Sequence, residues 1–130
     1  MRVRYVVYTS HLADPAGPAL VPGIIRAARA NNAIRGITGA LIYDGERFCQ
    51  YIEGAPDEME RTYDAIRNDP RHDRIEVLAS GDAPSQRFAD WSMGFVYAAL
   101  PALIDRLSER PVGSVADAFE NALADCDIEA

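Results

Sequence analysis

Residues 36–54, with the sequence GITGALIYDGERFCQYIEG, constrain the fold more than any other stretch of this 130-residue chain. Two apolar runs, about 37–43 and 48–53, flank the dipeptide Asp44-Gly45, and this arrangement predicts a β-hairpin. The second run carries Gln50 at its centre. A buried primary amide costs roughly 1–3 kcal/mol of folding free energy unless its donors and its acceptor are paired. Gln50 is therefore expected to contact either another part of the protein or a bound molecule.

The rest of the chain arranges strands and helices around this hairpin. The predicted elements are a strand over 2–9, a helix over 19–32, the hairpin, a helix over 56–68, and strands over 75–79 and 90–97, with loops over 13–18 and 80–86. This β-α-β-β-α-β-β order favours an α+β, ferredoxin-like, five-stranded mixed sheet with two helices on one face. The first strand is apolar on both faces, so we expect the amphipathic segments 101–109 and 114–125 to cover the other face.

Charge and composition argue against several kinds of partner. The net charge of −7 disfavours nucleic-acid binding. Seven acidic but two basic residues lie after residue 96, and we interpret this acidic tail as a solvated surface. No apolar run approaches the roughly 20 residues that a membrane span requires, and no signal-peptide pattern begins the chain, so a cytoplasmic protein without membrane contact is expected. Cys49 and Cys126 fit no metal-binding spacing, which predicts reduced thiols and no metal.

The predicted sheet brings Gln50 close to a tyrosine. Gln50 shares a strand face with Phe48, and the first and third strands are neighbours in a ferredoxin-like order, so Tyr8 and Gln50 can meet beneath the first helix. The expected inward stripe of that helix is Leu20, Ile24, Ala28 and Asn31. With Asn32 and with Ile66 of the second helix, these residues form a pocket of donors and acceptors between aliphatic walls, without an acid–base pair. Such a pocket suits a flat heteroaromatic ring with amide-like edges.

Each of these polar or aromatic residues also has an ordinary structural interpretation. Tyr8 fits a satisfied core tyrosine, Gln50 a bridge between two strands, Asn31-Asn32 a helix end in the left-handed region, Trp91 and Met93 a strand core, and His72 a helix end or a phosphate contact. The pattern leaves these alternatives open. What indicates a ligand site is the convergence of several such residues on one pocket.

Five segments resemble those of a known family. VVYTS, NNAIRGITGALIY, FCQYIEG, IRNDPRH and RFADWSM stand in the order and spacing of the BLUF domain, the blue-light sensor that uses FAD. The resemblance covers about residues 1–97, which we treat as a flavin-binding domain, and 98–130 then form a helical extension on the sheet. Because the 33 residues after Tyr97 are too few for an effector domain, the chain is most similar to the short, stand-alone type.

The resemblance implies a role for each candidate residue. In this family a flavin ring lies between the two helices, the strand glutamine bonds the ring near N5 and the C4 carbonyl, and a tyrosine is its partner. By motif match the photoactive pair is Tyr8 and Gln50, and the flavin-binding set is Ile24, Asn31, Asn32, Phe48, Gln50, Ile66, Arg71 and His72, with Trp91 and Met93 in signalling. Ala28 and Ala30 stand where many members carry Ser or a basic residue, so FAD is expected while FMN and riboflavin stay open.

The implied function is a photocycle without net turnover, and therefore not an enzyme activity. Tyr8 donates an electron and a proton, Gln50 changes its hydrogen bond to the C4 carbonyl, and the fifth strand and C-terminal helices carry the signal to an unidentified protein or to a second copy of the chain. A cysteine–flavin adduct, as in LOV sensors, is rejected because strand parity puts Cys49 on the opposite face. The alternatives are a flavin-dependent oxidoreductase, which would need a substrate base and a nucleotide fingerprint, and a cofactor-free ferredoxin-like interaction module.

Overall fold

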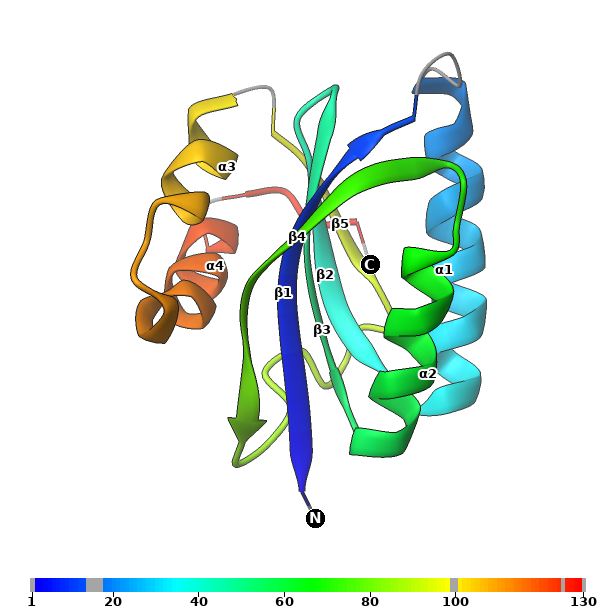
Figure 1. Cartoon of the computed structure of the whole chain (residues 1–130), viewed down its shortest axis with the longest axis vertical. Coiled ribbons are helices and arrows are strands. Elements are labelled where there is room, and N and C mark those ends of the chain that lie inside the picture. The colour runs from blue at the N-terminus through cyan, green and yellow to red at the C-terminus, as the bar shows by residue number, and fades with distance from the viewer. Residues whose placement is uncertain (1, 14–17, 99–100, 125, 130) are drawn as a thin grey trace.

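The computed structural model, which describes residues 2–13, 18–98, 101–124 and 126–129, contains one five-stranded sheet of order β4-β1-β3-β2-β5 (Figure 1). Its strands are β1 (Val3–Leu12), β2 (Thr38–Tyr43), β3 (Arg47–Gly54), β4 (His72–Ala83) and β5 (Gly94–Tyr97). Neighbouring strands are antiparallel except β2 and β5, which are parallel. The predicted ferredoxin-like α+β fold with a mixed sheet is therefore confirmed.

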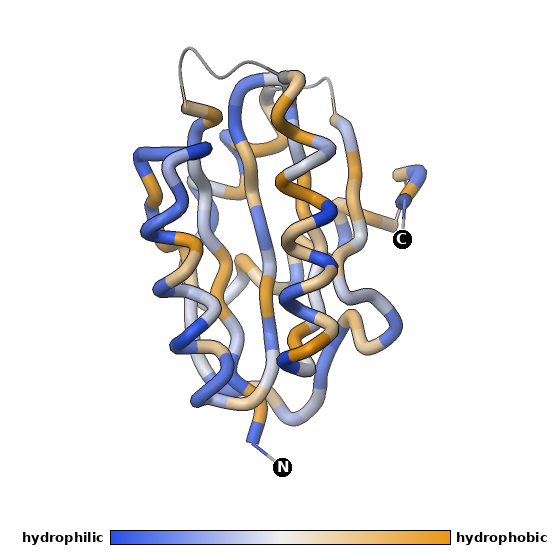
Figure 2. The backbone as a smooth tube through the Cα atoms, turned by 90° about the vertical axis from the view of Figure 1, so that its right-hand side faces the viewer, coloured by the Kyte–Doolittle hydropathy of each residue, from blue (hydrophilic) through white to orange (hydrophobic). Residues whose placement is uncertain are grey.

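Helices cover both faces of the sheet, as predicted. The helices are α1 (Val21–Arg35), α2 (Pro56–Arg67), α3 (Pro101–Ser108) and α4 (Val115–Leu123), with short 3-10 turns η1 (Pro18–Leu20) and η2 (Val112–Ser114). α1 and α2 lie on one face, and α3 and α4 on the other (Figure 1). Figure 2 looks onto the first face, where α1 and α2 lie side by side in front of the sheet and α2 is mostly hydrophilic.

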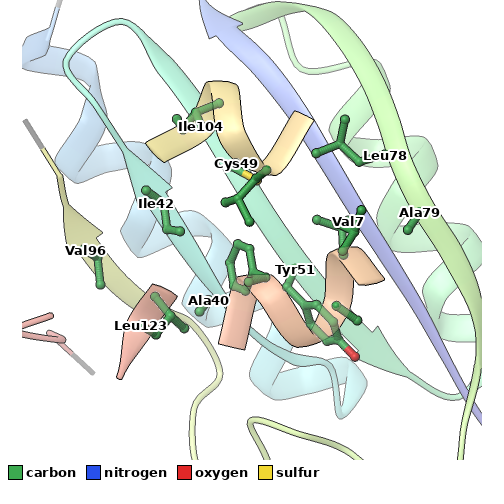
Figure 3. Close-up of a cluster of buried hydrophobic side chains, with 14 of the residues drawn as sticks. Val7, Ala40, Ile42, Cys49, Tyr51, Leu78, Ala79, Val96, Ile104 and Leu123 are labelled. Atoms are coloured by element: carbon green, nitrogen blue, oxygen red, sulfur yellow. The ribbon is translucent and has the colours of Figure 1, made fainter. Parts of the chain in front are cut away.

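The larger apolar core lies on the face covered by α3 and α4. Cys49 and Tyr51 of β3 point into it, as does Ile104 of α3 (Figure 3). The ring of Tyr51 also lies against that of Phe119 of α4, with ring centroids 5.8 Å apart. Complete burial of a side chain such as Phe119 stabilises the fold by about 1.5–3 kcal/mol. Strand alternation then directs Gln50 to the opposite face, toward α1 and α2. The C-terminal helices thus complete a core that leaves the other face of β3 free for a site.

The first helix ends later than predicted. α1 continues to Arg35 because Gly36, with a φ of 67°, provides the left-handed residue that ends a helix, and its N–H donates to the Asn32 carbonyl. Asn31 and Asn32 consequently lie inside the helix, and the interpretation of this pair as a helix end is wrong. Of the predicted loop 13–18, residues 14–17 lie outside the described residues.

Strand β4 is longer than predicted. It spans His72–Ala83, against a prediction of 75–79, because the ten-residue β1 offers a pairing edge as far as Val3, which lies opposite Ala83. The loop predicted at 80–86 is therefore wrong for 80–83.

Strand β5 is shorter than predicted, since it begins at Gly94 and not at 90. The hairpin turn also lies one residue later, at Gly45-Glu46, because the Asp44 N–H donates to the Arg47 carbonyl at 3.1 Å and Gly45 has a φ of 102°. Trp91 and Met93 thus precede the fifth strand, and the prediction that they lie within it is wrong.

Candidate functional site

A cavity of about 130 Å³ lies between α1, α2 and the face of β1 and β3 that these two helices cover. All predicted site residues except Trp91 and Met93 line it, namely Tyr8, Ile24, Asn31, Asn32, Phe48, Gln50, Ile66, Arg71 and His72. The structure thus brings together residues that are up to 64 positions apart in the sequence. Their role in binding a ligand stays a prediction.

Tyr8 and Gln50 form the buried centre of this cavity. They lie opposite each other on β1 and β3, and the Tyr8 hydroxyl donates a hydrogen bond to Gln50 Oε1. Burial raises the pKa of Tyr8 above its ordinary value, and the nearby Cys49 and Tyr63 raise this pKa further. The phenol therefore stays protonated at any physiological pH, and its bond gives the Gln50 oxygen one of the partners that a buried amide needs.

The amide NH2 group of Gln50 has a weaker hydrogen-bond partner than the amide oxygen. Gln50 Nε2 lies 3.5 Å from Met93 Sδ, and a thioether sulfur is a weak acceptor. The residue is only 6% exposed, so water does not replace a strong partner easily. An amide with donor capacity left beside a cavity fits a ligand that presents a carbonyl oxygen or a ring nitrogen at that point.

Only one residue of the asparagine pair is buried, and it is Asn32. The buried residues of α1 are Val21, Ile25 and Asn32, each one position after Leu20, Ile24 and Asn31 of the predicted stripe. Asn32 Nδ2 donates to the Ser92 carbonyl at 2.7 Å, whereas Asn31 is exposed but lines the cavity. Three residues of the predicted stripe, Ile24, Ala28 and Asn31, nevertheless line the cavity.

The side walls of the cavity consist of aliphatic side chains, several of them small. Ile24 of α1 and Ile66 of α2 line it, together with the small residues Ala27, Ala28 and Ala65. Small side chains on both helices leave a gap that larger ones would fill. The walls and the polar floor together fit a flat aromatic ring with one polar edge, which is the chemistry of a flavin ring.

The end of the cavity near the C-terminus of α2 is held by an internal ion pair. The Arg71 guanidinium bonds both carboxylate oxygens of Asp69, at 2.7–3.1 Å, and these bonds lower the pKa of Asp69. His72 Nε2 lies 2.8 Å from the Ile66 carbonyl, which can only accept, so Nε2 carries a proton. His72 Nδ1 then meets the Ser10 hydroxyl at 2.9 Å. Both ring nitrogens of His72 are already used within the protein.

Several lining residues were missed from the sequence. They are Ser10, Ala27, Arg35, Leu41, Thr62, Ala65 and Asp69. Arg35 continues the spacing of Ile24, Ala28 and Asn31 by one more turn, and the early predicted end of the helix hid it. Its contacts are weak, since Arg35 Nη1 is 3.5 Å from Thr62 Oγ1.

Trp91, Met93 and Cys49 lie outside the cavity lining. Trp91 stacks on Phe88, with ring centroids 5.7 Å apart, and packs against the core on the α3 and α4 side. Met93 is buried at 1% exposure and reaches the site through its sulfur. Cys49 lies on the opposite face, as predicted, and burial raises the pKa of its thiol to about 12, so it is a neutral thiol that does not reach the cavity.

The described residues contain no group of three or more His, Cys, Asp or Glu placed to hold a metal ion. Within the same residues, none of the helices combines the length and apolar character that crossing a membrane demands.

The fold and this cavity define a small α+β domain with a slot for a flat ring between two helices. A family model described as BLUF, sensors of blue-light using FAD, matches residues 3–94. The chain therefore belongs to the BLUF family of flavin-binding blue-light sensors.

Curated relatives are similar over the same region. The chain is 32% identical over 93 residues to the photoactivated adenylate cyclase subunit beta of Euglena gracilis, and 32% identical over 88 residues to the blue light- and temperature-regulated antirepressor BluF of Escherichia coli (strain K12). These matches cover 70% and 68% of this chain but 11% and 22% of the relatives, so the chain spans a minor part of their length. Among solved structures, the dark state of the BLUF protein BlrB aligns with a TM-score of 0.78 at 32% identity, over 95% of this chain and 96% of that one.

Proposed function

We propose that this chain is a blue-light photoreceptor whose photoactive pair is Tyr8 and Gln50. The observation that carries the proposal is the hydrogen bond from the Tyr8 hydroxyl to Gln50 Oε1 at the buried end of the cavity. Membership of the BLUF family supports blue light as the stimulus and a flavin as the chromophore. We assign light sensing to residues 1–97 and signal output to 98–130.

The residues around the cavity fit a flavin. Ile24 and Ile66 would contact the two faces of the ring, Asn31 and Asn32 its polar edge, and Phe48 would line its inner end, with Arg71 and His72 toward the ribityl and phosphate chain. A bound flavin supplies blue-light absorption and, in its excited state, a strong oxidant. FAD is our first choice, with FMN and riboflavin as alternatives that share the same ring.

In this proposal Tyr8 gives up one electron, which the light-excited flavin would accept, together with its phenolic proton. Burial disfavours a charged phenol, so the electron and the proton leave together; Gln50 Oε1 is the hydrogen-bonded atom that receives the proton, and Gln50 Nε2 would release one toward the flavin. Gln50 then rotates or tautomerises, which exchanges the donor and acceptor ends of its amide and changes its hydrogen bond toward the C4 carbonyl. Electron and proton return to Tyr8, so the cycle has no net turnover and the protein acts as a sensor.

The output follows from the contact between Gln50 and Met93. A turned amide presents a different atom to Met93 Sδ and shifts the balance between two arrangements of segment 91–97. β5 and the helices α3 and α4 would pass this change to another protein or to a second copy of the chain.

The absorption spectrum of the purified protein, before and after blue light and through dark recovery, tests the proposal. A reversible red shift of an intact flavin spectrum is expected. If the protein stays colourless after reconstitution with flavin, the remaining function is that of a cofactor-free interaction module. A flavin that bleaches without a red shift would favour the oxidoreductase.

A further inference from the structure

We propose, building on the photoreceptor function above, that Arg29 is a positioning residue that couples the C-terminal segment 126–129 to the Tyr8–Gln50 pair through Met93. Arg29 lies on α1 outside the cavity lining. Its guanidinium joins two distant parts of the chain, the backbone at Met93 and the backbone at Glu129.

The backbone around Met93 is held by side chains of α1. Arg29 Nε donates to the Met93 carbonyl at 3.0 Å, and Asn32 Nδ2 donates to the Ser92 carbonyl at 2.7 Å. These two carbonyls precede β5, whose pairing with β2 begins at Gly94. Met93 Sδ is the described partner of Gln50 Nε2, so the bonds from α1 hold the backbone from which that sulfur extends.

The C-terminal segment pairs with the outer edge of β5. Phe95 N–H donates to the Glu129 carbonyl at 2.7 Å, and Glu129 N–H donates to the Phe95 carbonyl at 2.8 Å. In Figure 1 this segment crosses from α4 to the β5 side of the sheet. Ile128 packs so closely there that a Cβ on Gly94 would lie 3.2 Å from its Cγ2 atom.

Arg29 closes the link between these two regions. Its Nη2 donates to the Glu129 carbonyl at 2.8 Å, so one planar guanidinium holds Met93 and Glu129 together. The contact with the Glu129 carboxylate is weaker, at 3.4 Å with a side chain that is 70% exposed. The coupling therefore depends on the Arg29 guanidinium and on the backbone of Glu129. The negative charge of Glu129 contributes little to it.

Coupling of this kind acts in both directions. If the segment leaves the β5 edge, Arg29 loses a partner and Met93 is held less firmly against Gln50. If light turns Gln50, the contact at Met93 changes and the segment is held less firmly in turn. A partner that captures residues 126–129 would then prolong the signalling state.

Two pairs of matched variants test this inference by dark recovery. Arg29→Ala removes the guanidinium, and Glu129→Pro removes the N–H that donates to the Phe95 carbonyl. Each is expected to slow dark recovery of the red-shifted spectrum by about threefold or more, and the double variant is expected to be no slower than the slower single variant. Arg26→Ala, an exposed arginine of the same helix, and Glu129→Gln, which keeps the backbone bonds, should recover as the unmodified protein does.

Amide hydrogen exchange provides a second reading that does not depend on light. The Phe95 amide should exchange faster in Arg29→Ala than in Arg26→Ala, in the dark. Arg29→Lys replaces Arg29→Ala if the latter does not fold, because a lysine cannot reach both carbonyls with fixed geometry. Equal or faster recovery of Arg29→Ala relative to Arg26→Ala, or no effect of Glu129→Pro, overturns the coupling. Absence of a red shift in the unmodified protein would instead refute the photoreceptor function, and the exchange measurement would still decide the role of Arg29.

Discussion

Tyr8 and Gln50 face each other across the β1–β3 pair, and the phenol of Tyr8 donates a hydrogen bond to the amide oxygen of Gln50 at the buried end of the cavity. Tyr8→Phe removes that donor and keeps the ring. We expect the variant to fold and to remain yellow with flavin, at a cost of about 1–3 kcal/mol in unfolding free energy from the Gln50 oxygen left unpaired. It should lose the reversible red shift, which an absorption spectrum under blue light measures. A normal shift would contradict the role of Tyr8.

Gln50→Leu tests the other member of the pair. Leucine has a similar volume and no hydrogen-bonding atoms, so the flavin should still bind between Ile24 and Ile66 while the red shift is abolished. Light-minus-dark difference spectra at equal flavin content give the answer. If the shift survives in Gln50→Leu, the mechanism proposed above is wrong.

The sequence predicted the frame of this protein well because its hairpin is strongly patterned. The two-residue period of a strand settled which residues of β3 share a face with Gln50, and the structure agrees. Ends of elements were predicted poorly where tertiary contacts decide them. β4 extends to Ala83 because β1 offers an edge, and β5 starts late because Arg29 and Asn32 bind the carbonyls before it. The residue pattern within one helix or strand does not predict either of these tertiary contacts.

The same reasoning explains what was missed in the site. The spacing of Ile24, Ala28 and Asn31 leads directly to Arg35, but the helix was ended too early at the asparagine pair. Asp69 was missed since a carboxylate in a loop resembles solvated surface until its partner Arg71 is located in space.

Glu53 anchors the loop that leads to Met93, and its replacement should destabilise the fold. This fully buried carboxylate accepts the backbone N–H groups of Arg87 and Phe88, both at 2.7 Å, and the Thr38 hydroxyl at 2.9 Å. Glu53→Gln puts an NH2 group against one of these donors. We expect unfolding free energy to fall by about 2–4 kcal/mol in urea denaturation. Glu120→Gln, which affects an exposed ion pair with Arg87, should change it by less than about 1 kcal/mol.

Cys49 should make folding stability fall at high pH. Burial raises the pKa of its thiol to about 12, whereas an unfolded cysteine has a pKa of about 8.5. Above the unfolded value the unfolded chain loses a proton that the folded chain keeps, so the folded state loses stability as pH rises from about 9 toward 12. Cys49→Ala should weaken this decline between pH 9 and 10 in urea titrations. A thiol reagent at neutral pH should modify the partly exposed Cys126 and reach Cys49 only after unfolding.

Arg35 is predicted to select phosphorylated flavins. Among the cations lining the cavity, Arg71 is bonded to Asp69 and both nitrogens of His72 are used, whereas the contacts of Arg35 are long, at 3.5 Å to Thr62 and 4.0 Å to Glu58. A guanidinium with weak internal partners is available for a phosphate group. Arg35→Gln should therefore lower the affinity for FMN and FAD by about tenfold, which corresponds to about 1.4 kcal/mol, and leave riboflavin affinity unchanged. Flavin fluorescence titrations with the three ligands, and with Arg26→Gln as the control on the same helix, measure this difference. An equal loss for riboflavin would show that Arg35 supports the cavity walls, and equal affinities for all three in both variants would remove it from the binding site.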